Sequence, residues 1–183
     1  VVAASQLKLR TLEGVWRPAI ATVIPTPVKP FLLLDAGATP DCSSDLLYQF
    51  SLMGSVYSRE ILNVARPAVG LLSIGEEAAK GNANTKEAFQ LMSQSKKINF
   101  VGNVESSDMF AGSVDVVVCD GFVGNVVLKT SESVAKALGH WVKDEIKTSP
   151  LAMVGALLAK RVFVNMKRRA DPAQYGGAPL LGV

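Results

Sequence analysis

Four short apolar runs recur along the chain, and each passes directly into glycine and polar residues. Runs of this length and character predict strands that are buried on both faces, as in a parallel sheet covered by helices. They are PFLLLDAGA (Pro30–Ala38), AVGLLSIGEE (Ala68–Glu77), INFVGNVE (Ile98–Glu105) and VDVVVCDGFVGN (Val114–Asn125).

Helical patterns lie between these runs. Ser43 or Ser44 can cap a helix whose apolar residues recur at three- and four-residue steps. Thr85 can cap a shorter helix, and a third helix follows Gly124 and ends before Pro150. Strands that alternate with helices predict a parallel sheet flanked by helices.

The polar residues after the four runs are expected to share one edge of that sheet. Carboxyl ends of parallel strands meet at one edge, where α/β proteins bind their ligands. These residues are Asp35 and Gly37; Ser73, Gly75 and Glu76; Gly102, Asn103 and Glu105; and Asp120, Gly121, Gly124 and Asn125.

Length and composition fit one globular α/β domain over residues 1–183, with 49% hydrophobic residues. The first residues predict a helix closed by Gly14, and both ends of the sequence look cut, so we expect a fragment. No apolar run approaches the ~20 residues of a spanning helix. Cys42 and Cys119 match no metal or redox spacing, which favours reduced core thiols and a cytoplasmic protein.

Several residues on the expected edge could carry chemistry, and each also has a simple structural interpretation. The glycines of Asp120-Gly-Phe-Val-Gly-Asn125 suit either an anion at a helix N-terminus or close strand-to-helix packing. Lys80 can pair with phosphate, or it can be a solvated loop lysine. Asn125 can donate to an oxyanion or cap its helix, and Asp120 can orient a substrate group or form a turn.

A covalent or metal-dependent mechanism finds little support in the sequence. Cys119 lies inside an apolar run, and the single histidine, His140, follows far along the next helix, so we expect a buried structural thiol. No group of histidine, cysteine and acidic residues has metal-ligand spacing, so no metal site is predicted.

The sequence resembles the phosphate acyltransferase family usually called PlsX, collinearly over nearly the whole chain. The matching segments are RPAIATVIPT, LLLDAGA, MGSVY, VGLLSIGEE, KGNANTKEAF, NFVGNVE, DVVVCDGFVGNVVLKT and YGGAPLLGV. The resemblance implies a three-layer α/β/α fold, Rossmann-like with a mostly parallel sheet, related to phosphotransacetylases and the isocitrate and isopropylmalate dehydrogenases. It also implies transfer of a fatty acyl group from acyl carrier protein to inorganic phosphate for phospholipid synthesis, without a cofactor.

The resemblance assigns catalysis to Lys80 in KGN and to Asn125 in GFVGN. We expect phosphate to attack the thioester directly, held by Lys80 and by N–H groups of the Gly102 and Gly121 loops, while Asn125 steadies the oxyanion. The residues expected to bind substrate or phosphate are Asp35, Asn82, Gly102, Asn103, Asp120, Gly121 and Gly124.

Two residues depart from the family pattern, because Ser73 and Thr39 stand where asparagines are expected. The glycine-rich N-terminal segments and a C-terminal stretch of the family are also absent. The nearest alternative is a phosphotransacetylase or phosphotransbutyrylase that uses acyl-CoA. A dehydrogenase of the related fold would need an aspartate cluster that the sequence lacks, and a non-catalytic membrane scaffold is a third reading.

The net positive charge of the chain belongs to its C-terminal part, because residues 151–183 hold five Lys/Arg and one acid, against 14 Lys/Arg and 15 acids in the rest. Residues 148–172 predict a protruding helical segment whose apolar stretch, Leu151–Ala159, is too short to span a bilayer. Its tip, with Leu157 and Leu158, can dip into the cytoplasmic leaflet beside a membrane acyltransferase, or the segment can pack in a homodimer. We therefore expect a cytoplasmic, peripherally membrane-associated dimer that binds acyl carrier protein and phosphate but no nucleic acid.

Overall fold

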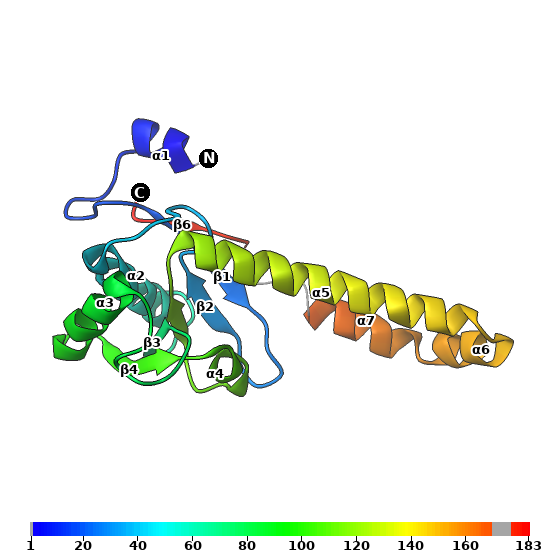
Figure 1. The fold of residues 1–183 in the computed structure, drawn as a ribbon. Helices are drawn as coiled ribbons and strands as arrows, with labels where there is room; N and C mark the ends of the chain where they lie inside the picture. The colour runs from blue at the N-terminus through cyan, green and yellow to red at the C-terminus, as the bar shows by residue number, and fades with distance from the viewer. Residues whose placement is uncertain (1, 170–176) are drawn as a thin grey trace.

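The four apolar runs form four parallel strands in a computed structural model, which describes residues 2–169 and 177–183. They are β2 (Phe31–Leu34), β3 (Ala68–Leu72), β4 (Asn99–Val104) and β5 (Val116–Val118). Together with β1 and β6 they give a sheet in the order β4-β3-β5-β2-β1-β6. The predicted mostly parallel sheet is therefore confirmed (Figure 1).

Two strands on the other side of β2 run antiparallel to their neighbours and were not predicted. Strand β1 (Ala19–Ile24) pairs with β2, and β6 (Leu180–Leu181) pairs with β1. Pro18 and Pro25 lie just outside β1, where a missing N–H removes no ladder bond. The segment RPAIATVIPT thus contains an apolar stretch between two prolines. This pattern is compatible with a strand, but no strand was predicted from it.

One face of the sheet is covered by α2 (Ser44–Glu60) and α3 (Ala83–Gln94), which pack with Leu34, Val69 and Val116 in one core cluster. Ser43 caps α2, as predicted, by accepting from the Leu46 N–H. The predicted cap of α3 was wrong, because Asn82 rather than Thr85 precedes the helix. The Asn82 side chain accepts from the Thr85 N–H at 2.9 Å.

The opposite face is covered by α4 (Ser106–Ala111) and the first turns of α5 (Gly121–Lys147). Met109 of α4 belongs to the second core cluster, and Val127 and Leu128 of α5 pack against it. Helix α4 was not predicted, although Glu105 and Asp108 form a capping box at its start and Gly112 ends it. The two helix pairs complete the three-layer α/β/α arrangement.

Beyond the sheet, α5 continues into α6 (Pro150–Leu158) and α7 (Lys160–Arg169), which extend together as an elongated arm (Figure 1). No residue of α6 or α7 is buried. Residues 170–172, the end of the segment expected to protrude, lie outside the described residues. Within the described ranges, no helix is both long and apolar enough to cross a membrane.

The N-terminal helix is shorter than predicted. Helix α1 spans Val2–Lys8 and stops well before Gly14, because Arg10 adopts a positive φ of 65° that an α-helix does not allow. Val1, the first residue of the predicted helix, lies outside the described residues.

Helix α2 approaches the sheet closely because Gly54 carries no side chain where it crosses. A Cβ added there would lie 2.6 Å from Cγ1 of Val116 and 3.4 Å from Cδ2 of Leu34. Contacts under about 3 Å force either the helix or the strand to move. The distance between α2 and the sheet therefore depends on this glycine.

We predict that Gly54→Ala destabilises the protein by about 1–3 kcal/mol, because overpacking outweighs the better helix propensity of alanine. The matched control is Gly139→Ala in α5, where an added Cβ meets nothing within 4 Å. That variant should gain about 0.5–1 kcal/mol. Urea unfolding of both variants measures the difference, and equal shifts in the two would contradict the close-packing account.

Candidate functional site

The ends of β3, β5 and β2 bring polar residues together at the carboxyl edge of the sheet. Val118 pairs with Leu71 on one side and with Leu34 on the other. Continuing these registers puts Ser73 beside Asp120, and Asp35 beside Cys119. Adjacent strands are about 4.8 Å apart, so residues from the three strand ends share a small surface.

Asp35 is fully buried, and its carboxylate is occupied by backbone N–H groups of the protein itself. Oδ1 accepts from Ile20 at 2.9 Å, from Gly37 at 3.1 Å and from Ala38 at 2.9 Å. Oδ2 accepts from Ala38 at 3.0 Å and from Thr39 at 2.7 Å. The Asp35 carboxylate thus shapes the loop after β2 and ties that loop to β1, which gives this residue a structural role beside the expected one in substrate binding.

The two glycines at the start of α5 serve close packing. A Cβ on Gly124 would collide with the carbonyl oxygen of Asp35, and one on Gly121 would lie 2.7 Å from the carbonyl oxygen of Thr39. The Gly121 N–H also donates to that Thr39 oxygen at 2.8 Å. Of the two interpretations of this turn, packing is the one that the geometry favours.

Asp120, and not Asn125, is the N-cap of α5. Its side chain accepts from the Val123 N–H at 2.8 Å, and its carbonyl accepts from the Gly124 N–H at 2.9 Å. The helix begins at Gly121, one turn earlier than expected, because this cap satisfies the first free N–H groups there. Asn125 lies within the helix, so capping no longer explains its presence.

Three further residues expected to bind substrate have structural partners or lie elsewhere. The Asn103 amide is buried and donates to the Glu77 carbonyl at 2.8 Å, which holds the loop after β3. Asn82 caps α3. Gly102 lies inside β4, opposite Gly70 in the pairing with β3, and not in a loop.

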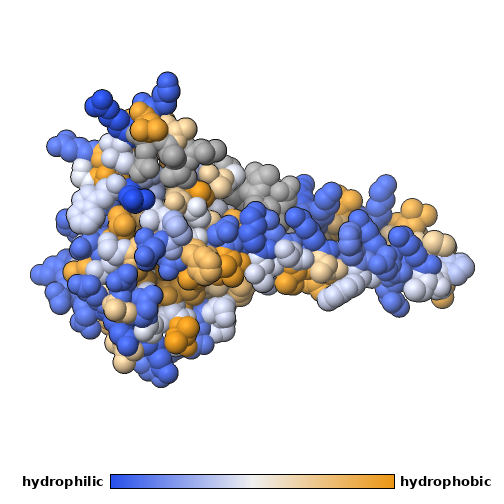
Figure 2. Space-filling model, turned by 45° about the horizontal axis from the view of Figure 1, so that its top comes forward, coloured by the Kyte–Doolittle hydropathy of each residue, from blue (hydrophilic) through white to orange (hydrophobic). Residues whose placement is uncertain are grey.

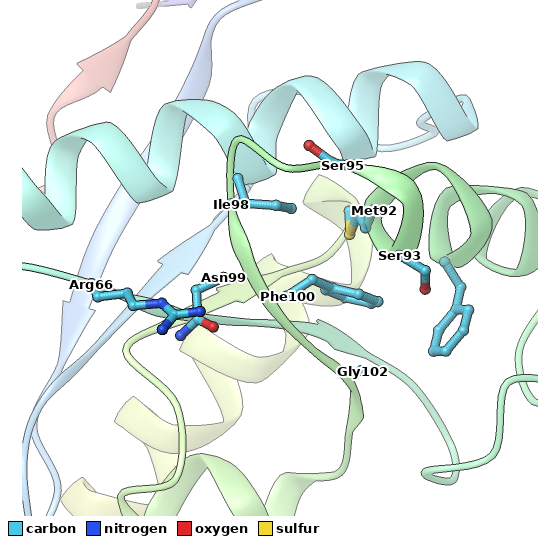
Figure 3. Close-up of a pocket in the computed structure, with 9 residues that line it drawn as sticks. Arg66, Met92, Ser93, Ser95, Ile98, Asn99, Phe100 and Gly102 are labelled. Carbon is cyan, nitrogen blue, oxygen red and sulfur yellow. The ribbon is translucent and has the colours of Figure 1, made fainter.

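Gly102 lines a hollow of about 380 Å³ beside the outer strand β4 (Figure 3). Arg66, which comes before β3, and Asn99, the first residue of β4, lie side by side in it. The hollow therefore opens near the amino ends of these strands. Gly102 thus lines this hollow within β4, two residues before the strand ends, and does not belong to the loop after the strand.

Lys80 and Asn125 are exposed, and neither side chain has a hydrogen bond or ion pair with the described residues. The aliphatic part of Lys80 lies over Gly75, where a Cβ would be 2.9 Å from Lys80 Cγ. Asn125 lies against Gly37, where a Cβ would be 3.5 Å from Asn125 Cβ. Because Gly75 follows β3 and Gly37 follows β2, the two side chains flank the end of β5.

The two residues that depart from the expected pattern have different environments. Thr39 is buried, and its carbonyl accepts from the Gly121 N–H and from the Cys42 thiol at 3.4 Å. The Ser73 hydroxyl is buried without a hydrogen-bond partner among the described residues. A Cβ on Gly81 would lie 3.5 Å from it, so the hydroxyl sits beneath the loop that carries Lys80.

Comparison with known proteins agrees with this geometry. A family model described as "Fatty acid synthesis protein" matches residues 1–183. The chain belongs to this family. A phosphate acyltransferase from Campylobacter fetus is 55% identical over 178 residues, covering 97% of this chain and 54% of the relative. One from Acidobacterium capsulatum is 51% identical, covering 100% of this chain and 54% of the relative.

The solved structures that resemble this member of the fatty acid synthesis protein family share its fold at low sequence identity. The EutD phosphotransacetylase from Staphylococcus aureus superposes with a TM-score of 0.59 and 17% identity, covering 74% of this chain and 47% of that one. A Streptococcus pyogenes phosphotransacetylase gives 0.56 and 14%, covering 69% and 44%. The chain spans about half the length of the curated relatives it matches.

Sequence reasoning passed over two exposed apolar residues beside Asn125, namely Phe122 and Val126. Asn125 and Val126 follow Phe122 by three and four residues. Residues at this spacing share a helix face, so the sequence did indicate that these side chains lie together. In this family member they lie at the start of α5, where Figure 2 shows apolar side chains gathered at the base of the arm.

Both thiols are buried close to carboxylates, and neither suits nucleophilic catalysis. Burial, followed by the charge of Asp35, raises the pKa of Cys42 to about 12. Burial and the charges of Asp120 and Asp35 raise the pKa of Cys119 well above its ordinary value. His140 lies exposed on the arm. Among the described residues, no group of three His, Cys, Asp or Glu side chains is placed to hold a metal ion.

We predict that neither thiol of the native protein reacts appreciably with iodoacetamide at pH 8. A pKa of about 12 leaves only about one Cys42 in 10,000 as thiolate at that pH, against about one in ten at the ordinary value of 9.0. Native labelling should therefore rise only as the pH approaches 12, while the unfolded chain labels readily at pH 8. Rapid native labelling of Cys119 at pH 8 would contradict the buried-thiol assignment. Mass spectrometry of the labelled peptides distinguishes the two sites.

Proposed function

We propose that this chain carries the central part of a phosphate acyltransferase that moves a fatty acyl group from acyl carrier protein to inorganic phosphate. The observation that carries the proposal is the pair of exposed side chains, Lys80 and Asn125, that have no partner among the described residues and lie on either side of the β5 end. Asp35, Asn103 and Asp120 at the same edge already accept or donate hydrogen bonds within the protein, and the Ser73 hydroxyl is buried. The name of the curated relatives, phosphate acyltransferase, supports acyl transfer to phosphate, and the acyl carrier protein as donor is part of the proposal.

In the proposed reaction, a phosphate oxygen attacks the thioester carbonyl carbon. The C–S bond then breaks, the carrier thiolate leaves and acyl phosphate is formed, so no oxidation, cofactor or acyl-enzyme intermediate is needed. Lys80 balances the charge of the phosphate, and the Asn125 amide donates a hydrogen bond to the oxygen that becomes negative. These positions put the nucleophile and the acyl donor on opposite sides of the β5 end.

The geometry changes one part of the mechanism expected from sequence. The Gly121 N–H is used by Thr39, and Gly102 lies in β4, so neither backbone group is proposed to hold phosphate. Phosphate is proposed to depend on Lys80 and on groups contributed by the rest of a protein of full family length. This agrees with a chain that covers about half of its curated relatives.

The second candidate is an acyl-CoA:phosphate transferase of the phosphotransacetylase or phosphotransbutyrylase type. Two phosphotransacetylases share the fold of this chain, and for that reason this reaction is the second candidate. At 17% and 14% identity, the similarity concerns the fold alone. Free thiol measured with acyl-carrier protein and with acyl-CoA as separate donors distinguishes the two. Faster turnover of acyl-CoA at equal concentration favours the second candidate.

We predict that Lys80→Ala, in a protein of full family length carrying this sequence, lowers phosphate-dependent thiol release about 100- to 1,000-fold. This is the usual effect of removing one charge-stabilising donor. The control is Lys97→Ala, an exposed lysine after the C-terminal end of α3, which should retain the parent rate. Near-normal turnover of the Lys80 variant would remove this lysine from the mechanism.

The arm is proposed to provide both dimer contacts and membrane contact. Exposed apolar residues follow α5 and α7 along its length, while α6 at the tip exposes Leu157 at 71% and Leu158 at 83%. We propose that α5 and α7 pack against a second copy and that the α6 tip enters the cytoplasmic leaflet. An acyl phosphate is too apolar to diffuse freely in water, so a membrane acyltransferase would receive it there. Along the arm, beyond the first turns of α5, the exposed apolar residues of α5 and α7 are Val134, Leu138, Trp141, Val142, Val162, Phe163, Val164 and Met166.

Basic residues next to the tip support the same orientation. Lys160, Arg161 and the Lys167–Arg169 cluster belong to α7. Each basic group near an anionic surface contributes about 1 kcal/mol, which salt weakens, whereas insertion of leucine resists salt. Membrane binding should thus have a salt-sensitive part and a salt-resistant part.

We predict that Leu157→Glu combined with Leu158→Glu abolishes cosedimentation with anionic liposomes at high salt. The double variant should stay dimeric and active on soluble substrate, because the tip is remote from the carboxyl edge (Figure 1). A matched control replaces Leu7 and Leu9, two equally exposed leucines near the N-terminus, with glutamate. If the tip variant cosediments at high salt as well as the parent does, the membrane-tip proposal is wrong.

A further inference from the structure

Phe122 and Val126 are exposed apolar side chains four residues apart on α5, with Asn125 beside them. Phe122 is 65% exposed and Val126 is 48% exposed. Residues three and four apart in a helix share a face, so Phe122, Asn125 and Val126 form one continuous strip at the start of α5. An amide donor at the edge of an apolar strip suits a ligand that is polar at one atom and aliphatic beyond it.

Packing of α5 fixes which way this strip faces. The helix turns Gly121 and Gly124 toward the loop after β2, and Val127 and Leu128 pack in the second core cluster. With that face buried, Phe122 and Val126 cannot turn inward without displacing the helix. The packing of α5 against the sheet therefore determines that Phe122 and Val126 are exposed.

Ile74 adds a third apolar side chain from the neighbouring loop, and at 83% exposed it is among the most exposed residues of the sheet region. It follows Ser73, which the strand register places beside Asp120 and hence beside the start of α5. The loop backbone is held on both sides of Ile74, since the Ser73 N–H donates to the Val104 carbonyl at 3.0 Å and Asn103 binds Glu77. Ile74 is thus fixed at the same edge as the strip on α5.

We propose that Phe122, Val126 and Ile74 bind the first methylene groups of the acyl chain, next to the thioester carbonyl. This inference rests on the proposed function and names the part of the donor that the site recognises. Asn125 contacts the carbonyl oxygen, and the aliphatic segment leaves the carbonyl carbon along the apolar strip. Burial of these side chains against the acyl methylenes removes apolar surface from water and so stabilises the bound donor. An acetyl group lacks these methylenes and gains no such stabilisation.

The test compares acetyl, hexanoyl and palmitoyl donors on acyl carrier protein, using a protein of full family length with Phe122→Ala or Phe122→Leu. For Phe122→Ala, kcat/KM should fall about tenfold or more with hexanoyl and palmitoyl donors and less than about threefold with acetyl. The losses for hexanoyl and palmitoyl should be similar, because only the proximal methylenes meet the strip. KM for phosphate should not change, and Phe122→Leu should restore most of the loss.

The matched control is Val101→Ala, a valine of β4 that is exposed to nearly the same extent as Val126. It should leave the chain-length profile unchanged, whereas Val126→Ala should reduce hexanoyl and palmitoyl transfer selectively. An equal loss for all three donors together with a lower melting temperature would overturn the inference, because Phe122 would then be a packing position for the rest of the protein. Unchanged kinetics for all three would overturn it as well. If the parent makes no acyl phosphate from any donor, the proposed function fails instead.

Discussion

The carboxylate of Asp35 joins strand β1 to the loop after β2 at the carboxyl edge of the sheet. It accepts from Ile20 in β1 and from Gly37, Ala38 and Thr39 in the loop after its own strand. A buried carboxylate without such partners costs several kcal/mol, whereas each hydrogen bond to a charged group contributes about 1.5–3 kcal/mol. The loop therefore has one conformation in which the charge is satisfied.

The position of α5 follows from that loop. Thr39, held by Asp35, offers its carbonyl to Gly121, and Gly124 lets the helix approach the Asp35 backbone. Together with the Asp120 cap, these contacts occupy the backbone N–H groups of Gly121, Val123 and Gly124. They also determine which side chains face outward, namely Phe122, Asn125 and Val126. Because the Asp35, Asn103 and Asp120 side chains are used within the protein, few side chains of the edge are left for substrate.

The sequence was sufficient for the parts of the fold that depend on local pattern. Four apolar runs specify the parallel strands, and Ser43 marks the start of α2. Strand β1 was missed because its apolar stretch between two prolines was not interpreted as a strand, and one of its two partners, β6, lies at the far end of the chain. The start of α3 was misplaced because both Asn82 and Thr85 are cap-forming residues and only the geometry distinguishes them.

For the candidate site, residue type predicted which polar residues gather at the carboxyl edge of the sheet but not the contacts that each of them makes. Asp35 and Asn103 look like substrate ligands in the sequence, because nothing local shows that their partners are backbone groups of Ile20 and Glu77. Gly102 was misplaced because the apolar run does not show where strand β4 ends. The site assigned to Lys80 and Asn125 came from a resemblance, and their lack of partners is compatible with it.

A structure of a full-length protein carrying this sequence, with inorganic phosphate bound, tests the central claim most directly. The account predicts a phosphate within hydrogen-bond distance of Lys80 Nζ, above the end of β5 and facing Asn125, with all four backbone donors of Asp35 still in place. Phosphate bound to the backbone N–H groups of residues 37–39 after displacement of the Asp35 carboxylate would contradict the account. Phosphate in the hollow beside β4, with the Lys80 side chain unoccupied, would contradict it equally.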